Sequence, residues 1–153
     1  MPFINLVVSH RPDRALARTL AQGLAERTTR ILRKHADVTA AAVSFADPAH
    51  WFAGGSSLEE LGLASFWLDV KVTAGTNTRE EKAAFLADTT AFLRGVLGPL
   101  HEGSYILVHE VPSDAWGYAG LSQGRRAADA AARAPGHPVA DQAGQPAQER
   151  GGA

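Results

Sequence analysis

Two stretches of the chain that begin 64 residues apart, at positions 2 and 66, share the pattern expected of β-strands. Positions 2–9 and 66–73 are rich in β-branched and aromatic residues, and turn-forming residues follow each of them. The apolar runs at 41–46 and 104–111 predict two further strands. The pattern therefore predicts four strands in two pairs.

Between the strands of each pair, apolar residues recur at helical spacing. The first helix follows Arg11-Pro12-Asp13, where proline suits a first turn whose N–H groups are unpaired. The second begins at Thr78, whose capping box is completed by Glu81, and Gly98-Pro99 ends it. The predicted buried faces consist of Leu16, Leu20, Leu24, Ile31 and Leu32, and of Ala84, Phe85, Phe92, Leu93, Val96 and Leu97. The cationic residues Arg27, Arg30, Arg33 and Lys34 are assigned to the solvated side of the first helix.

The two halves are copies of one unit. Trp51-Phe52-Ala53-Gly54-Gly55 matches Trp116-Gly117-Tyr118-Ala119-Gly120 at a spacing of 65 residues (116 − 51). Each half reads strand, helix, strand, with repeat one over 2–58 and repeat two over 66–121. Because a single β-α-β unit leaves a sheet edge uncovered, we expect the copies to pair their sheets. The expected fold class is α+β, a four-stranded sheet with two helices on one face.

Composition narrows the class of protein. With 15 basic and 16 acidic residues, the chain lacks the excess of positive charge that binding to nucleic acid or to an anionic membrane requires. The absence of cysteine excludes disulfides, thiolate metal sites and cysteine nucleophiles. No apolar run approaches the roughly 18 to 20 residues of a membrane span, and the N-terminus lacks the basic start of a signal peptide. We expect a cytoplasmic protein.

The last thirty residues differ from the rest. Eighteen residues of 124–153 are Ala, Gly or Pro, and Val139 is the only large aliphatic residue there. Such a segment buries too little apolar surface to offset the entropy of ordering it. We therefore expect a folded domain over 2–123 and a mostly disordered tail over 124–153, in which Ala127–Ala134 could form a short helix.

Pro2 is the most informative candidate for a catalytic residue. Removal of the initiator methionine, which is usual before proline, would leave Pro2 with a free secondary amine. A primary α-amino group has a pKa of about 7.7 to 8.0. Placing the proline amine among Phe3, Ile4 and a tryptophan would lower its pKa, as proton transfer next to a carbonyl requires. Many proteins nevertheless carry proline at this position with no such role.

Three segments together resemble the tautomerase superfamily, and in particular its fused members with two tandem copies of the unit. They are Met1-Pro2-Phe3-Ile4, Val108-His109-Glu110-Val111-Pro112 and Trp116-Gly117-Tyr118-Ala119-Gly120. The resemblance implies that Pro2 is the catalytic base and acid acting on a small-molecule carboxylate. It also implies one working site per chain, since Phe66 replaces the proline in the second repeat. A homotrimer, with no metal or organic cofactor, would follow.

The resemblance also suggests which residues bind substrate. Arg11 falls near a family arginine that holds a carboxylate, and its counterpart in the second repeat is Thr76. A second family arginine is missing, because Ala40 and Tyr105 stand at its position; Tyr105 could donate a hydrogen bond instead. Trp116 is expected to form the aromatic wall, in preference to Trp51. His109 is a further candidate, although only one of His109 and Glu110 can face the site. Each of these residues also fits an ordinary surface or packing role.

Other functions stay open at this point. The same site could carry out dehalogenation, hydration or decarboxylation, but the extra arginines and glutamate of such dehalogenases are replaced here by Thr73, Thr76 and Tyr118. A ferredoxin-like dimer that binds a small molecule or acts as a cofactor-free oxygenase would have the same order of elements. In that case Pro2 would be incidental. A catalytically silent relative is another alternative.

Overall fold

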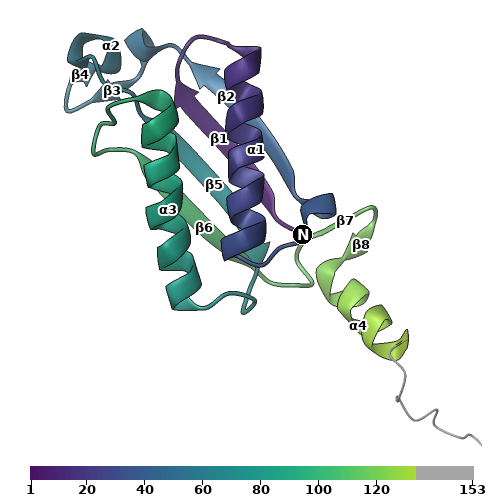
Figure 1. Cartoon of the computed structure of the whole chain (residues 1–153). Helices are drawn as coiled ribbons and strands as arrows, with labels where there is room; N and C mark the ends of the chain where they lie inside the picture. The colour runs from purple at the N-terminus through teal and green to yellow at the C-terminus, as the bar shows by residue number, and fades with distance from the viewer. Residues whose placement is uncertain (134–153) are drawn as a thin grey trace, which may run out of the picture.

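The structure is a computed structural model that describes residues 1–133. A four-stranded mixed sheet and two long helices form its main body (Figure 1). The sheet consists of β1 (Phe3–Ser9), β2 (Ala40–Ala46), β5 (Phe66–Thr73) and β6 (Tyr105–Val111), and the long helices are α1 (Arg14–Ile31) and α3 (Arg79–Leu97). The shorter elements are η1 (Ala36–Val38), η2 (Pro48–His50), β3 (Phe52–Ala53), β4 (Ser56–Ser57), α2 (Leu58–Leu61), β7 (Gly117–Tyr118), β8 (Leu121–Ser122) and α4 (Gln123–Arg133).

The sheet confirms the predicted pairing of two β-α-β units. Its order is β2-β1-β5-β6, with β1 parallel to β2, β5 parallel to β6, and β1 antiparallel to β5. Each long helix therefore connects two neighbouring strands. A ferredoxin-like sheet has split β-α-β units, so that alternative does not describe this chain.

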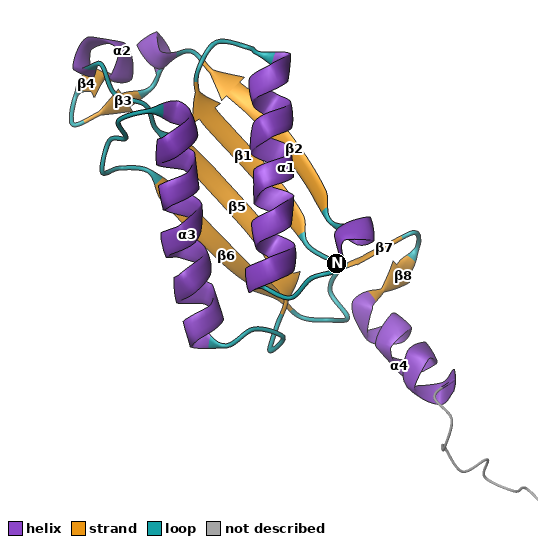
Figure 2. Ribbon diagram, in the orientation of Figure 1, coloured by secondary structure: helices purple, strands orange, loops and turns teal. Residues whose placement is uncertain are grey.

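Both long helices cover the same face of the sheet (Figure 2). Alternate strand residues turn toward them and are fully buried, because successive side chains in a strand point to opposite faces. The buried residues are Ile4, Leu6 and Val8 of β1, Phe66, Leu68, Val70 and Val72 of β5, and Leu20, Leu24, Leu32, Phe85 and Leu93 from the helices and their ends. The opposite face stays open and exposes aromatic side chains, among them Phe3, Trp67 and Tyr105.

The ends of the long helices follow the predicted signals, with one difference. The Thr78–Glu81 capping box is present, and α3 ends at Gly98. At α1 the cap is Asp13, whose carboxylate accepts hydrogen bonds from the N–H groups of Ala15 and Leu16. Pro12 thus precedes the cap and is not part of the first helical turn.

The C-terminal part extends beyond the predicted domain boundary at residue 123. Helix α4 covers Gln123–Arg133, has no buried residue, and leads away from the sheet in Figure 1. Alanine favours helix strongly, which accounts for a helix without a core. The rest of the expected tail, 134–153, lies outside the described residues.

Candidate active site

The N-terminus lies at one end of the sheet, between the start of β2 and the end of β5. Pro2 is buried, and its carbonyl accepts a hydrogen bond of 3.3 Å from the N–H of Ala40. Phe3 pairs with Lys71, two residues before the end of β5. Because β1 and β5 are antiparallel, the segment that follows β5 reaches this same end of the sheet.

The environment of the N-terminal amine favours its neutral form. Burial, and next the positive charge of Lys34, lower the pKa of the amine of Met1. Lys34 follows the C-terminal end of α1, where Arg33 adopts a left-handed backbone conformation with φ of 54°. The N–H of Lys34 donates to the carbonyl of Thr28 at 3.4 Å. This turn directs the chain, and Lys34 with it, back toward the start of the sheet.

The loop after β5 forms a hydrogen bond with the side chain of Lys34. Lys34 Nζ donates to Thr76 Oγ1 at 2.8 Å, and Thr76 Oγ1 donates to the carbonyl of Thr73 at 2.6 Å. Asn77 Nδ2 donates to the carbonyl of Leu32 at 2.9 Å. These bonds tie the second repeat's loop to the end of the first repeat's helix, so the corner is built from both repeats.

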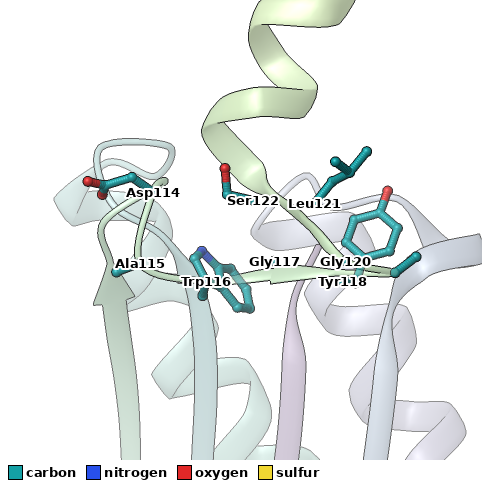
Figure 3. Close-up of a pocket in the computed structure, with 9 residues that line it drawn as sticks. Asp114, Ala115, Trp116, Gly117, Tyr118, Gly120, Leu121 and Ser122 are labelled. Carbon is teal, nitrogen blue, oxygen red and sulfur yellow. The ribbon is translucent and has the colours of Figure 1, made fainter.

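The β7–β8 hairpin lies next to the N-terminus in Figure 1. A hollow of about 460 Å³ is lined by its residues, Asp114 to Ser122. Figure 3 shows the indole of Trp116 on the side of the hairpin that faces the sheet, with Tyr118 further along. Within the described chain, Trp116 Nε1 is buried without a hydrogen-bond partner. It is therefore a free donor on this hairpin, and the preference for Trp116 over Trp51 stays a prediction.

Two of the predicted binding residues lie at the other end of the sheet. Arg11 comes after the C-terminal end of β1, and the six residue steps from Phe3 to Ser9 alone span about 20 Å. Tyr105 begins β6, where its ring lies 5.7 Å from that of Trp67. The structure does not bring either residue to Pro2 within one chain. The length of β1 itself separates Arg11 from Pro2, and the antiparallel pairing of β1 with β5 puts the start of β6, and with it Tyr105, at the far end.

His109 occupies an intermediate position on the open face of the sheet. It pairs with Lys71, which pairs with Phe3, so two strand spacings of about 4.8 Å each separate the His109 and Phe3 backbones. His109 Nε2 lies 2.6 Å from Asp69 Oδ1, and Trp67 Nε1 donates to Asp69 Oδ2 at 2.9 Å. An orienting carboxylate therefore holds the imidazole away from the helices.

Comparisons with known proteins agree with this architecture. The sequence model of the family described as "Tautomerase enzyme" matches residues 67–126. A fused 4-OT solved as a symmetric trimer shares 20% identity at a TM-score of 0.69, covering 80% of this chain and 96% of its own. A macrophage migration inhibitory factor-like protein from Entamoeba histolytica shares 16% identity at a TM-score of 0.66, covering 79% and 97%. No curated protein matches the sequence.

The second repeat of the chain matches the tautomerase family, and about 80% of the chain has the fold of the fused 4-OT and macrophage migration inhibitory factor-like structures. A further similar structure is that of Pt0534 inactivated by 2-oxo-3-pentynoate, with 12% identity, a TM-score of 0.70, and coverage of 81% of this chain and 98% of that one. At these identities the solved structures establish the shared fold, while the family match covers the second repeat.

The residue that sequence reasoning missed is Lys34. Helical spacing assigned it to the solvated side of the first helix, yet it is half-buried, and burial lowers its pKa while the charges of Glu81 and Glu110 oppose that shift. The available signal was that it comes after the last buried leucine, Leu32, where a helix can end. Arg27 also differs from the prediction, since it packs 4.0 Å from the centre of the Phe92 ring.

The described part of the chain, residues 1–133, lacks two features. No three His, Asp or Glu side chains of that part of the chain gather as metal ligands would. Nor does it contain a helix whose length and apolar character would suit a membrane span.

Proposed function

We propose that this chain is a cofactor-independent tautomerase in which the free amine of Pro2, released by removal of Met1, acts as general base and then as general acid. The substrate class is a small 2-oxo acid or its enol. The observation that carries the proposal is the placement of the N-terminal amine at a buried, cationic corner of a tautomerase fold.

The chemistry follows from the state of the amine. A neutral secondary amine accepts the enol O–H proton or the C3 proton of the keto form, and the resulting ammonium returns a proton to the other atom. The amine regains its lone pair when it returns the proton to the substrate, so no other reagent is consumed. Burial and the charge of Lys34, which lower the pKa of the Met1 amine, would act on the Pro2 amine as well, because Pro2 lies deeper in the fold.

We further propose one such site per chain. Phe66, the counterpart of Pro2, is internal, so its nitrogen is an amide without basicity. We also propose a homotrimer, because the open sheet face exposes the aromatic residues Phe3, Trp67 and Tyr105 and a patch of this kind usually marks an interface. The fused 4-OT that this chain resembles is a trimer.

The decisive experiment changes only the amine. Intact mass first establishes whether Met1 is removed from the untagged protein. Turnover of a 2-oxo acid enol is then compared between the chain that starts at Pro2 and a chain with one added glycine before Pro2, in which the proline nitrogen is an amide. General acid–base catalysis contributes about 10²- to 10⁴-fold, so we expect a loss of kcat of that size. Equal turnover by the two chains would refute the assignment of Pro2.

A further inference from the structure

The β3–β4 hairpin lies at the end of the sheet opposite the N-terminus (Figure 1). A pocket of about 360 Å³ is bounded there by this hairpin and by the starts of β5 and β6. Its lining includes four aromatic side chains and one imidazole, those of Trp51, Phe52, Trp67, Tyr105 and His101. Among residues 1–133, no lysine, arginine, aspartate or glutamate contributes to this lining. Flat apolar walls with few polar groups are typical of small-molecule sites.

This pocket is the counterpart, in the internal repeat, of the Pro2 corner. Trp51 of the β3–β4 hairpin corresponds to Trp116 of the β7–β8 hairpin, and Phe66 corresponds to Pro2. The nitrogen of Phe66 is an amide, and its side chain is fully buried in the core. This end of the sheet therefore keeps an aromatic wall and lacks a basic nitrogen at the start of its strand.

Hydrogen bonds hold the loop before β6, which forms one wall of the pocket. The N–H of His101 donates to the carbonyl of Ala64 at 2.8 Å. The hydroxyl of Ser65 donates to the carbonyl of Gly103 at 3.1 Å. The hydroxyl of Ser104 donates to the carbonyl of His101 at 2.7 Å. The wall is thus formed before any ligand arrives, which lowers the entropic cost of binding.

The same loop determines which nitrogen of the His101 ring carries the proton. The N–H of Gly103 donates to His101 Nδ1 at 2.9 Å, so in the neutral ring the proton is on Nε2, which becomes a hydrogen-bond donor. Glycine suits this close approach, because a Cβ at Gly103 would lie 3.1 Å from His101 Nδ1 and 4.0 Å from Cε2 of Tyr105. The pocket therefore combines one oriented donor with aromatic walls.

The aromatic side chains of the pocket are available for contact. The rings of Trp67 and Tyr105 lie 5.7 Å apart with their planes inclined by 49°. The polar atom of Trp67, Nε1, donates to Asp69 Oδ2 at 2.9 Å, so the indole offers the pocket apolar contact. Trp67, Tyr105 and Phe52 are all exposed. Exposed apolar groups that gather in this way commonly mark a binding site.

We propose that this pocket is a second, non-catalytic binding site for a neutral aromatic compound that carries one hydrogen-bond acceptor, such as an aryl ketone. The ligand's ring packs against the aromatic walls, and Nε2–H of His101 donates to its acceptor. An anion is disfavoured, because no cation lines the pocket and the carboxylate of Asp69 lies beside the Trp67 indole. A cation is disfavoured because His101 offers a donor. The inference goes beyond the proposed function, since it does not use Pro2.

The test uses the three tryptophans of the protein, each of which gives one indole N–H signal by NMR. Trp51 and Trp67 line this pocket, whereas Trp116 lines the hollow of the β7–β8 hairpin. Acetophenone is titrated into the whole ¹⁵N-labelled protein, with signals assigned from Trp51→Phe and Trp67→Phe. We expect saturable shifts of the Trp51 and Trp67 signals and none at Trp116. Unshifted Trp51 and Trp67 signals, or an equal shift of Trp116, would overturn the proposal.

The role of His101 is tested by comparing acetophenone with ethylbenzene, which lacks the acceptor. The net contribution of a hydrogen bond corresponds to about 2- to 10-fold in affinity. We expect His101→Phe to shift the ratio of the two affinities toward ethylbenzene by that factor. The matched control, His109→Phe, changes a histidine outside the lining of the pocket and should leave the ratio unchanged. Equal weakening of both ligands by His101→Phe would show a structural role and overturn the assignment of the donor.

The charge of the ligand is tested with benzoate and benzyltrimethylammonium, which keep the ring and add a negative or a positive charge. Both should bind more weakly than acetophenone at the Trp51 and Trp67 signals. Binding of either compound as tightly as acetophenone would overturn the neutral class.

Sedimentation with and without acetophenone separates a ligand site from a subunit interface, because Trp67 and Tyr105 also belong to the patch on which a homotrimer is proposed. We expect the same sedimentation coefficient in both conditions while the Trp51 and Trp67 signals shift. Dissociation of the assembly by acetophenone would show that a second copy of the chain fills the pocket, and would overturn the proposal. The glycine-extended chain should bind acetophenone like the parent, whatever its turnover, so this result is independent of the fate of Pro2.

Discussion

Gly23 allows the two repeats to pack against each other. It lies in α1, and a Cβ built on it would be 2.1 Å from Cζ of Phe92 in α3. The same ring carries the guanidinium of Arg27 at 4.0 Å, and Arg27 pairs with Asp88 at 2.8 Å. A methyl group at Gly23 would therefore displace the ring and the ion pair built on it.

The expected change in the free energy of unfolding combines one stabilising and two destabilising contributions. Ala is favoured over Gly inside a helix by about 1 kcal/mol, whereas overpacking costs about 1–3 kcal/mol and loss of the ring–guanidinium contact about 0.5–1 kcal/mol. We expect Gly23→Ala to destabilise the fold by about 0.5–3 kcal/mol. The matched control is Gly95→Ala in α3, where nothing lies within 4 Å of the added Cβ. That variant should gain up to about 1 kcal/mol.

Urea unfolding followed by circular dichroism measures both variants, at one protein concentration because assembly shifts apparent stability. Adding Phe92→Leu should relieve Gly23→Ala, which a double-mutant cycle detects as coupling. If Gly23→Ala were as stable as Gly95→Ala, the close approach of α1 and α3 at this glycine would be wrong.

Three more predictions concern the site and the sheet. Trp116→Ala should lower kcat/KM for a 2-oxo acid enol about 10- to 100-fold while Trp51→Ala leaves it unchanged; the opposite order would place the site at the other end of the sheet. The rate should rise with pH as the Pro2 amine loses its proton. Lys34→Met should move this rise to higher pH, because it removes a positive charge that disfavours the protonated amine. A pH–rate profile that does not move would show that Lys34 does not lower the pKa of the Pro2 amine. Burial alone would raise the pKa of Asp69, but hydrogen bonds from Trp67 and His109 and nearby positive charges lower it overall. The ionised Asp69 therefore stabilises the fold fully above the unfolded pKa of about 3.9, and this stabilisation is lost as the pH falls through the lower folded pKa. Stability should fall more steeply with acid in the parent than in Asp69→Asn.

Much of the fold was predictable because its signals are local. The alternation of residues in 66–73 becomes the buried row of Phe66, Leu68 and Val70, and the capping box at Thr78 starts α3 where expected. The repeat also predicted the four-stranded sheet. The short helix α2 was missed, and for α4 only a short helix over 127–134 was expected, since neither has a long apolar stripe to mark it.

The candidate site depended on contacts between distant segments. The sequence alone placed a proline at position 2, one such proline per chain, and an aromatic residue, Trp116, after the last strand of the second repeat. Only the antiparallel pairing of β1 with β5 decided that Pro2 meets the loop of Thr76. Likewise, a left-handed turn at Arg33 brings Lys34 to that corner. Strand pairing and a single backbone turn join residues more than forty positions apart, and no local periodicity carries that information.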